Sequence, residues 1–173
     1  MPLIQLTKEN GSWTELKADW EEQCKKAEED FALYAQGTFI VLNQLADNPE
    51  KRAGIFALPR ENAVPDIICQ VNTTPLPGHP DPVLRVRMVT VCPEIDFGVA
   101  DAMDRYIDTM ADLFVGIVEL SLNGGDLAAN EFKLHLRSPH DVTFFRVMAR
   151  HFAGKPYFKN VAVHGAWLHV TKG

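Results

Sequence analysis

The residues best placed to do chemistry lie between a strand and a long helix, from Val83 to Leu122. The segment VLRVRMVTV is strongly β-forming, the chain breaks at Cys92-Pro93 and turns through EIDFGVA, and an amphipathic pattern continues to Leu122. When a strand ends at a proline and leads through a glycine into a helix, unpaired N–H groups are left at the helix start and favour an anion or a cofactor. We therefore expect either a binding turn here or a purely structural helix start.

Other reactive side chains show no arrangement typical of a catalytic or metal site. The three cysteines are widely spaced, which indicates reduced, buried thiols and no disulfide framework or CxxC metal knuckle. No G-x-S-x-G nucleophile elbow occurs, and His79 in the loop LPGHPDP is expected to be exposed. The remaining histidines fit no common metal cluster and are interpreted as surface or core residues: His135, His140, His151, His164 and His169.

Composition limits the kind of protein. The chain has 173 residues, 46% of them hydrophobic and 23% charged, which suits a single domain over residues 1–173. A net charge of −6 argues against a nucleic-acid surface. No apolar run reaches the roughly 18 residues of a membrane helix, and the first ten residues lack the apolar region of a signal peptide. We therefore expect a cytoplasmic protein without membrane or nucleic-acid partners.

The hydrophobic pattern predicts an order of elements that positions the turn. A helix is expected from a capping box at Ser12 and Glu15 to near Gly37, followed by strands in TFIVLNQL, AGIFALP and DIICQVNTT. The central strand and helix follow, and Asn123-Gly124-Gly125 ends that helix.

The last third of the chain carries clear signals of a strand, a helix and a terminal strand or hairpin. EFKLHLR alternates apolar and polar residues as a strand does. Ser138 and Asp141 mark the start of a helix, with a proline at its first position. The segment NVAVHGAWLHVTKG is expected to close the fold, with Gly165 as a bulge.

This order resembles that of the GCN5-related N-acetyltransferase (GNAT) superfamily, from roughly Ser12 to Val170. The resemblance is sharpest at Val91-Cys92-Pro93-Glu94 and at KLHLRS. It implies an α/β fold class, in the sense of an α+β mixed sheet: a GNAT-like central, mostly antiparallel sheet with helices on both faces. It also implies that the Val83–Val91 strand parts from the EFKLHLR strand and admits the pantetheine arm of acetyl-CoA or another acyl-CoA.

The turn between strand and helix resembles the family's [Q/R]-x-x-G-x-[G/A] pyrophosphate motif. Gly98 and Ala100 match its small positions, and Ile95 stands where the family has Gln or Arg. The cofactor contacts that the resemblance implies come from the strand end and the turn, at Val91, Pro93, Gly98, Val99 and Ala100. Acidic side chains around the same turn would repel a pyrophosphate: Glu94, Asp96, Asp101 and Asp104.

The family's proton-donating tyrosine corresponds here to Phe145, which has no proton to give. Tyr106, His135 and Tyr157 remain as alternative proton donors. Two functions follow from the sequence. One is an acyl-CoA-dependent N-acyltransferase acting on a small-molecule or peptide amine, and the other is a non-catalytic binding or assembly module on the same fold. The resemblance also implies a homodimer formed through edge strands.

Overall fold

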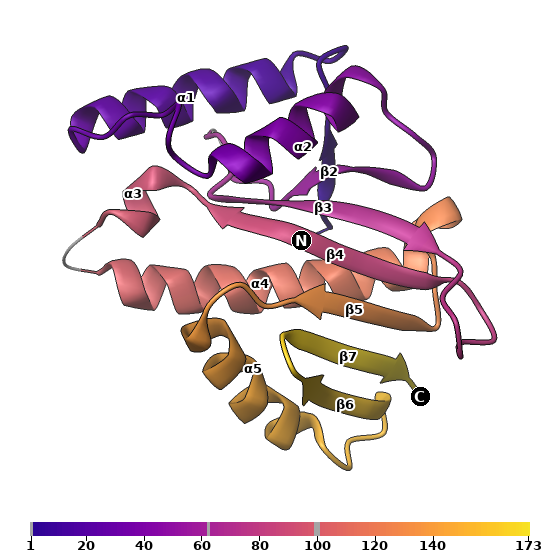
Figure 1. Cartoon of the computed structure of the whole chain (residues 1–173). Helices are drawn as coiled ribbons and strands as arrows, with labels where there is room; N and C mark the ends of the chain where they lie inside the picture. The colour runs from indigo at the N-terminus through magenta and orange to yellow at the C-terminus, as the bar shows by residue number, and fades with distance from the viewer. Residues whose placement is uncertain (1, 62, 99–100) are drawn as a thin grey trace.

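A computed structural model of the chain describes residues 2–61, 63–98 and 101–173, and its central feature is one seven-stranded mixed sheet. The strand order is β1-β2-β3-β4-β5-β7-β6, and β4 and β5 form its one parallel pair among the described residues. The elements in chain order (Figure 1) are β1 (Ile4–Leu6), α1 (Ser12–Lys26), α2 (Gln36–Asp47), β2 (Ala53–Ala57), β3 (Ile67–Thr74), β4 (Val83–Val91), α3 (Pro93–Asp96), α4 (Ala102–Asn123), the 3-10 turn η1 (Gly125–Leu127), β5 (Glu131–His135), α5 (Pro139–Phe152), β6 (Phe158–His164) and β7 (Trp167–Lys172).

Helices cover both faces of the sheet, so the predicted mostly antiparallel mixed sheet with helices on both faces is confirmed. Helices α1 and α2 lie over the β1–β3 part of one face, and α4 runs behind β4 and β5 on the other (Figure 1). Phe114 of α4 packs on Phe132 of β5 and on Phe145 of α5, with ring centroids 5.9 and 6.4 Å apart. These aromatic contacts hold α4 and α5 against the same face of the sheet.

The α1–α2 layer is fastened by buried aromatic side chains. Trp13 and Trp20 of α1 are fully buried, and both contact Phe39 of α2, at centroid distances of 5.6 and 6.1 Å. The indole N–H of Trp20 donates a hydrogen bond to the carbonyl of Pro65 just before β3 (3.2 Å). Burial of two tryptophans with their polar N–H groups satisfied fixes α1 rigidly on the sheet.

The prediction of a strand at TFIVLNQL is wrong, because these residues form most of α2. Its buried residues Thr38, Phe39, Leu42 and Ala46 follow a helical repeat, which places them on one side of a helix. A short apolar run rich in β-branched residues suits either a strand or a buried helix, and here packing against α1 decides it. The helix expected from Ser12 to near Gly37 is shorter, because α1 ends at Lys26 and non-helical residues lead from there to the start of α2 at Gln36.

The two predicted capping boxes have opposite outcomes. At Ser138 the box is present: the hydroxyl accepts from the Asp141 N–H (3.0 Å) and the Asp141 carboxylate accepts from the Ser138 N–H (2.9 Å). At Ser12 it is absent, because α1 begins after Gly11 in a left-handed conformation and the Ser12 hydroxyl accepts from the Thr7 N–H instead (3.1 Å).

The closing segment is a hairpin of β6 and β7. The sequence predicted either a single terminal strand or such a hairpin. Gly165 lies in its turn with φ of 59°, so the predicted bulge at this residue is wrong. The register instead shifts between Phe158 and Asn160. None of the helices in the described parts of the chain is long and apolar enough to span a membrane.

We expect Ser138→Ala to lower the free energy of unfolding by about 1 kcal/mol, because it removes the cap of α5. Urea denaturation followed by circular dichroism measures this. Thr143→Ala is the matched control: its hydroxyl is exposed on the same helix and bonds only back to Pro139, so it should change stability by less than about 0.5 kcal/mol. Equal effects of the two variants would contradict the capping role.

Candidate functional site

The candidate site begins where β4 and β5 stop pairing. The two strands pair only at Leu84–Phe132, Arg85–Lys133 and Val86–Leu134. Beyond Val86, residues Met88 and Val89 of β4 lie opposite a single residue of β3, and Met88 has a positive φ of 53°. A bulge of this kind bends its strand. The predicted divergence of these two strands is therefore present, and it starts after Val86.

A cavity of about 940 Å³ lies at this divergence. Its walls come from the end of β4, the α3–α4 region, the β5–α5 connection and the segment between α1 and α2. Of the predicted cofactor-binding residues, Val91 and Gly98 line this cavity. Pro93 is buried and is not among the lining residues. The remaining two predicted positions, Val99 and Ala100, lie outside the described residues.

Among the charged residues that line the cavity, acidic ones predominate. Its described residues include Glu29, Asp30, Asp96 and Asp141, and Arg137 is the one Lys or Arg among them. This balance favours a cationic ligand group in the cavity and disfavours a pyrophosphate, as the acidic turn in the sequence already indicates.

Arg137 follows β5 directly and reaches across the gap to β4. Its Nη1 donates to the carbonyl of Val89 (3.2 Å), to the hydroxyl of Thr90 (3.2 Å) and to the hydroxyl of Thr38 on α2 (3.1 Å). One guanidinium group thus joins β4, α2 and the end of β5 at the point where the strands have separated. Hydrogen bonds from a charged donor are stronger than neutral ones, so this contact helps to define the shape of the gap.

Two tyrosine hydroxyls face the cavity from opposite sides. Tyr34, between α1 and α2, donates to the carbonyl of Val91 at 2.5 Å, and Tyr106 of α4 donates to the carboxylate of Asp141. Burial raises the pKa of both phenols, and for Tyr106 the adjacent Asp141 carboxylate raises it further. Both groups therefore keep their protons near neutral pH.

Of the three alternative proton donors, one lies at the cavity. Tyr106 lines the cavity, whereas Tyr157 is 72% exposed and does not. His135 is half-buried on the open face of β5, outside the lining residues. Phe145, at the position of the family's tyrosine, is fully buried against Phe114 and Phe144 and points into the core. Tyr106 is therefore the candidate that the fold brings to the cavity.

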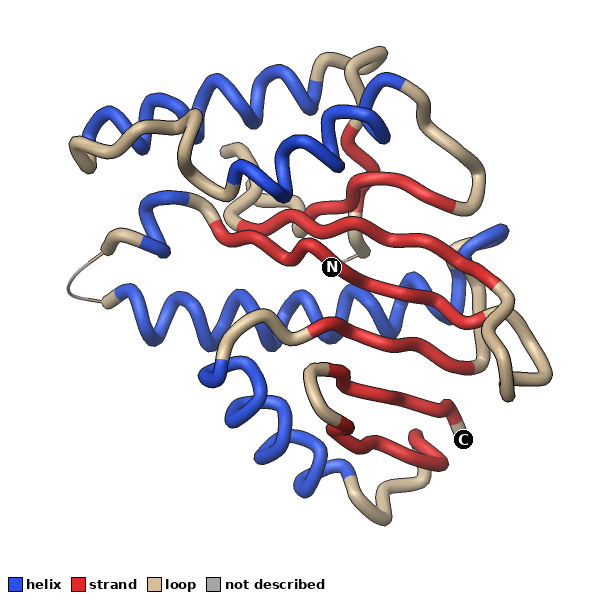
Figure 2. The backbone as a smooth tube through the Cα atoms, in the orientation of Figure 1, coloured by secondary structure: helices blue, strands red, loops and turns tan. Residues whose placement is uncertain are grey.

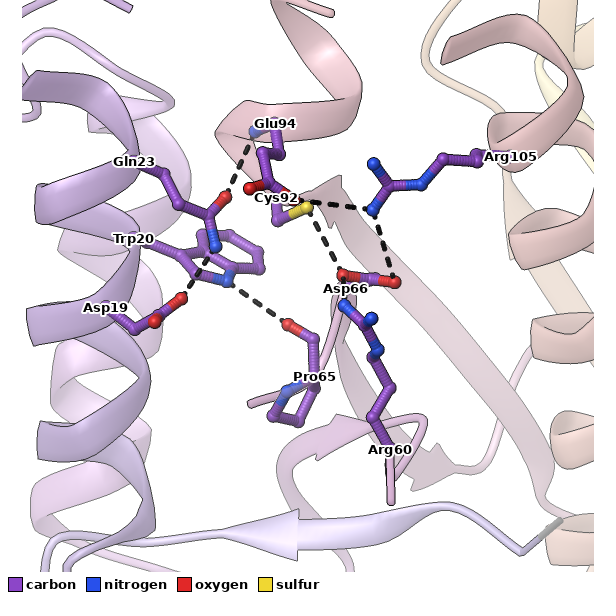
Figure 3. A network of polar contacts seen from close by, with 9 residues as sticks. All are labelled: Asp19, Trp20, Gln23, Arg60, Pro65, Asp66, Cys92, Glu94 and Arg105. Carbon is purple, nitrogen blue, oxygen red and sulfur yellow. Dashed lines mark hydrogen bonds and ion pairs between the residues drawn. The ribbon is translucent and has the colours of Figure 1, made fainter. Parts of the chain in front are cut away.

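A polar network fastens the wall of the cavity to α1 (Figure 3). The Glu94 N–H of α3 donates to Gln23 of α1 (3.0 Å), and Gln23 in turn donates to Asp19 (2.6 Å). These bonds join the start of α3 to a helix that is itself anchored by Trp20. The short helix α3 is thus held by side chains far away in the sequence, which no local motif reveals.

Asp66 is the centre of the same network. Its carboxylate accepts from Arg60 (2.6 Å) and from the Cys92 thiol (3.5 Å), and it lies 3.8 Å from Arg105 of α4. Arg105 also approaches Glu94 at 3.5 Å, so the contacts run from Asp66, just before β3, through Arg105 of α4 to α3 (Figure 3). Asp66 therefore joins Cys92, just after β4, to α4, and β4 and α4 both frame the cavity.

The structure also shows what surrounds the cysteines and histidines. Cys24, Cys69 and Cys92 are free and buried, as expected, and burial raises the pKa of both Cys69 and Cys92 to about 12. The prediction that His79 is exposed and unengaged is wrong: its ring contacts Glu131 at 2.6 Å and Lys133 at 3.1 Å. No group of three or more metal-ligating side chains gathers within the described ranges.

The residues that the sequence did not single out are Tyr34, Arg137 and Asp141. Their partners lie between 4 and 99 positions away along the chain, so spacing carries little information about them. Asp141 was recognised only as a helix cap, yet its carboxylate also receives the Tyr106 hydroxyl.

Comparison with models of known protein families gives no match to this chain. A search of curated proteins gives no significant match either. The function is therefore inferred from the cavity and its surroundings.

We expect Asp66→Ala to lower the free energy of unfolding by about 1–3 kcal/mol, because it leaves the half-buried partners of the carboxylate without their acceptor. Urea denaturation measures the change. Asp108→Ala removes the same charge from an exposed position on α4 and should change stability by less than about 0.5 kcal/mol. An Asp66→Ala variant as stable as this control would show that the network does not fasten the wall.

We expect stability to fall on acidification, partly through His135 and His169. Burial lowers the pKa of each ring below its ordinary value of 6.5, with Arg137 and Lys133 respectively as the next cause. Below 6.5 the unfolded chain then binds more protons than the folded one, so stability falls as the pH drops through 6.5 and levels off below the folded-state pKa.

Urea unfolding at about pH 7.5 and about pH 5.5 tests this. The double variant His135→Gln, His169→Gln should lose less stability over this interval than the wild type. Identical losses in the two proteins would contradict the assignment.

Proposed function

We propose that the protein is an acyl-CoA-dependent N-acyltransferase on a GNAT-like fold, with a degenerate CoA site. The observation that carries the proposal is the separation of β4 from β5 after three residue pairs, next to a cavity of about 940 Å³. A sheet that opens in its middle has peptide edges without strand partners, which suit an extended ligand such as pantetheine. Acetyl-CoA or another acyl-CoA is the proposed cofactor.

The residues fit one part of such a cofactor better than the other. The β4 segment from Val89 to Val91 lines the cavity and would hold the pantetheine arm. The nucleotide end has weaker support. Glu94 and Asp96 are acidic, and a Cβ at Gly98 would lie only 2.5 Å from the Glu94 carbonyl. Close packing between α3 and the following turn therefore accounts for the glycine without a phosphate.

When bound, acyl-CoA would supply an activated acyl group as a thioester. The acidic residues Glu29 and Asp30 beside the cavity would attract the amine of the acceptor. The amine nitrogen would bond to the acyl carbon as the bond from that carbon to sulfur breaks. Tyr106 would donate its phenolic proton to the departing sulfur and take up the proton that the amine releases, and Asp141 holds its hydroxyl in place. Fixing the donor in this way reduces the orientational cost of the proton transfer.

A second function is favoured by a different observation. Phe145 is part of the core, and the turn before α4 is flanked by carboxylates, which together indicate a fold without the usual donor and phosphate site. Both features suit a non-catalytic binding or assembly module. In this alternative a ligand would still bind in the cavity, but no acyl group would be transferred. The two functions therefore differ in catalytic activity.

We expect acetyl-CoA to raise the thermal stability of the protein. At a concentration 100 times its dissociation constant, a ligand of the folded state adds about 2.7 kcal/mol. Ala102→Trp, which fills part of the cavity, should abolish the shift. Val115→Trp, on an exposed part of the same helix, should retain it. No shift in the wild type at millimolar acetyl-CoA would remove the cofactor from the proposal.

We expect Tyr106→Phe to lower kcat for amine acylation by a factor of about 100 or more, because it removes the proton donor. Release of the CoA thiol measures the rate. Tyr157→Phe makes the same chemical change at an exposed residue and should leave kcat unchanged. If Tyr106→Phe retains kcat within twofold, the proton comes from elsewhere.

A further inference from the structure

The open face of the sheet beside the cavity carries a regular array of basic side chains. Residues opposite one another across β3, β4, β5 and β7 form one row of Asn72, Arg85, Lys133 and His169. A second row, next to the gap, contains Gln70 opposite Arg87, and His135 opposite Trp167. Both rows lie on the face away from α4, and no helix crosses in front of β4, β5 and β7 there (Figure 2).

Several polar atoms in these rows have no partner in the described parts of the chain. Gln70 is only 8% exposed, yet its Oε1 makes no hydrogen bond, and the same holds for the buried Nε of Arg87 and Oδ1 of Asn72. Buried polar groups without partners are uncommon in folded proteins and carry a desolvation cost. The Arg87 N–H can donate to a carboxylate, whereas the two amide oxygens can only accept, for example from peptide N–H groups, so a ligand that completes all three needs both kinds of group.

The charge of this face is opposite to that of the cavity. Arg85 and Arg87 form no ion pair with a carboxylate of the described residues, and Arg85 lies over the Trp167 ring at 5.6 Å. The carboxylate at the margin of the face, Glu131, is engaged by His79, whose ring also contacts Lys133 at 3.1 Å. Two arginines without a carboxylate partner, on a protein with a net charge of −6, favour an anion. Arginine pairs in particular suit the planar geometry of a carboxylate.

The two charged regions are joined along β4. Arg87 lies next to the bulge at Met88 and Val89, at the edge of the gap, and Arg85 lies two residues, about 7 Å, further along the regular part of β4. A molecule on this face with its amine in the acidic cavity would therefore reach the arginines with an anionic group a few residue lengths away. A short peptide has its amine and its terminal carboxylate at such a separation.

We infer that this face binds the carboxylate end of a short peptide whose free amine enters the cavity, with Arg85, Arg87 and Lys133 as the carboxylate-binding residues. The inference rests on the proposed acyl transfer for the identity of the peptide as acceptor. The carboxylate site itself rests on the sheet face. A second copy of the chain seated on this face is the competing occupant.

Binding of triglycine, compared with triglycine amide, tests the inference. The two peptides have the same amine and length and differ in the terminal negative charge. Trp167 reports on the face by fluorescence, because Trp13 and Trp20 are fully buried in the α1–α2 layer. We expect triglycine to bind at least about tenfold more tightly than its amide, as a charge-assisted hydrogen bond implies. Trp167→Phe should abolish the signal and identify its source.

Arg85→Gln and Lys133→Gln, made separately, should each reduce the preference for the carboxylate. Arg150→Gln, which removes the same charge from an exposed position on α5, should retain it. Equal affinity for the two peptides, or no response to either at millimolar concentration, would overturn the inference. A Trp167 signal that depends on protein concentration and ignores both peptides would assign the face to a second copy and also overturn it.

Acetyl-CoA separates this inference from the proposed function. If triglycine is preferred while acetyl-CoA fails to stabilise the protein, the carboxylate site stands and acyl transfer fails. If acetyl-CoA binds while the two peptides are equivalent, acyl transfer stands and the peptide-carboxylate site fails.

Discussion

The interruption of pairing between β4 and β5 is the constraint on which the rest of the site depends. Backbone groups inside a sheet need partners, and beyond Val86 the β5 strand no longer supplies them. Two side chains do so instead: Arg137 donates to the carbonyl of Val89, and Tyr34 donates to the carbonyl of Val91. One comes from the end of β5 and the other from the α1–α2 layer. The gap is therefore a stabilised feature of the fold, held open by specific side-chain contacts that replace part of the missing ladder.

The position of this gap also divides the charges of the molecule. On its helix side, the segment between α1 and α2, the end of α3 and the start of α5 bring carboxylates to the cavity, while the open sheet face beside it carries arginine, lysine and histidine. Gathering like charges in one small region costs free energy, because the charges repel one another and need hydration. The pKa of His135 is lowered mainly by burial and then by the nearby Arg137 and Arg87. In the proposed complex, a ligand with both charges at a fixed distance would satisfy the two regions together.

How much of this was accessible from the sequence depends on the range of the interactions. The central strand, the break at Pro93, the alternation of EFKLHLR and the Ser138 cap are set by residues a few positions apart, and all were predicted correctly. The helix at TFIVLNQL was missed because its burial against α1, and not its own propensity, decides its form. The bulge at Met88 carries no local signal, since a methionine with positive φ is uncommon and glycine would be the usual marker. The hydrogen bonds of Arg137 and Tyr34 join distant segments, so no spacing rule exposes them.

Phe145 and Tyr106 show how a core residue and a site residue are positioned by neighbouring helices. Phe145 completes an aromatic cluster with Phe114 and Phe144, and a hydroxyl there would enter a fully buried apolar region without a partner. Tyr106 of α4 instead reaches the cavity, and its hydroxyl meets Asp141, the residue that also caps α5. The carboxylate that starts α5 thus orients a phenol on a different helix. With Phe145 in the core, the cavity therefore receives its protonated hydroxyl from α4, and the start of α5 holds that hydroxyl in place.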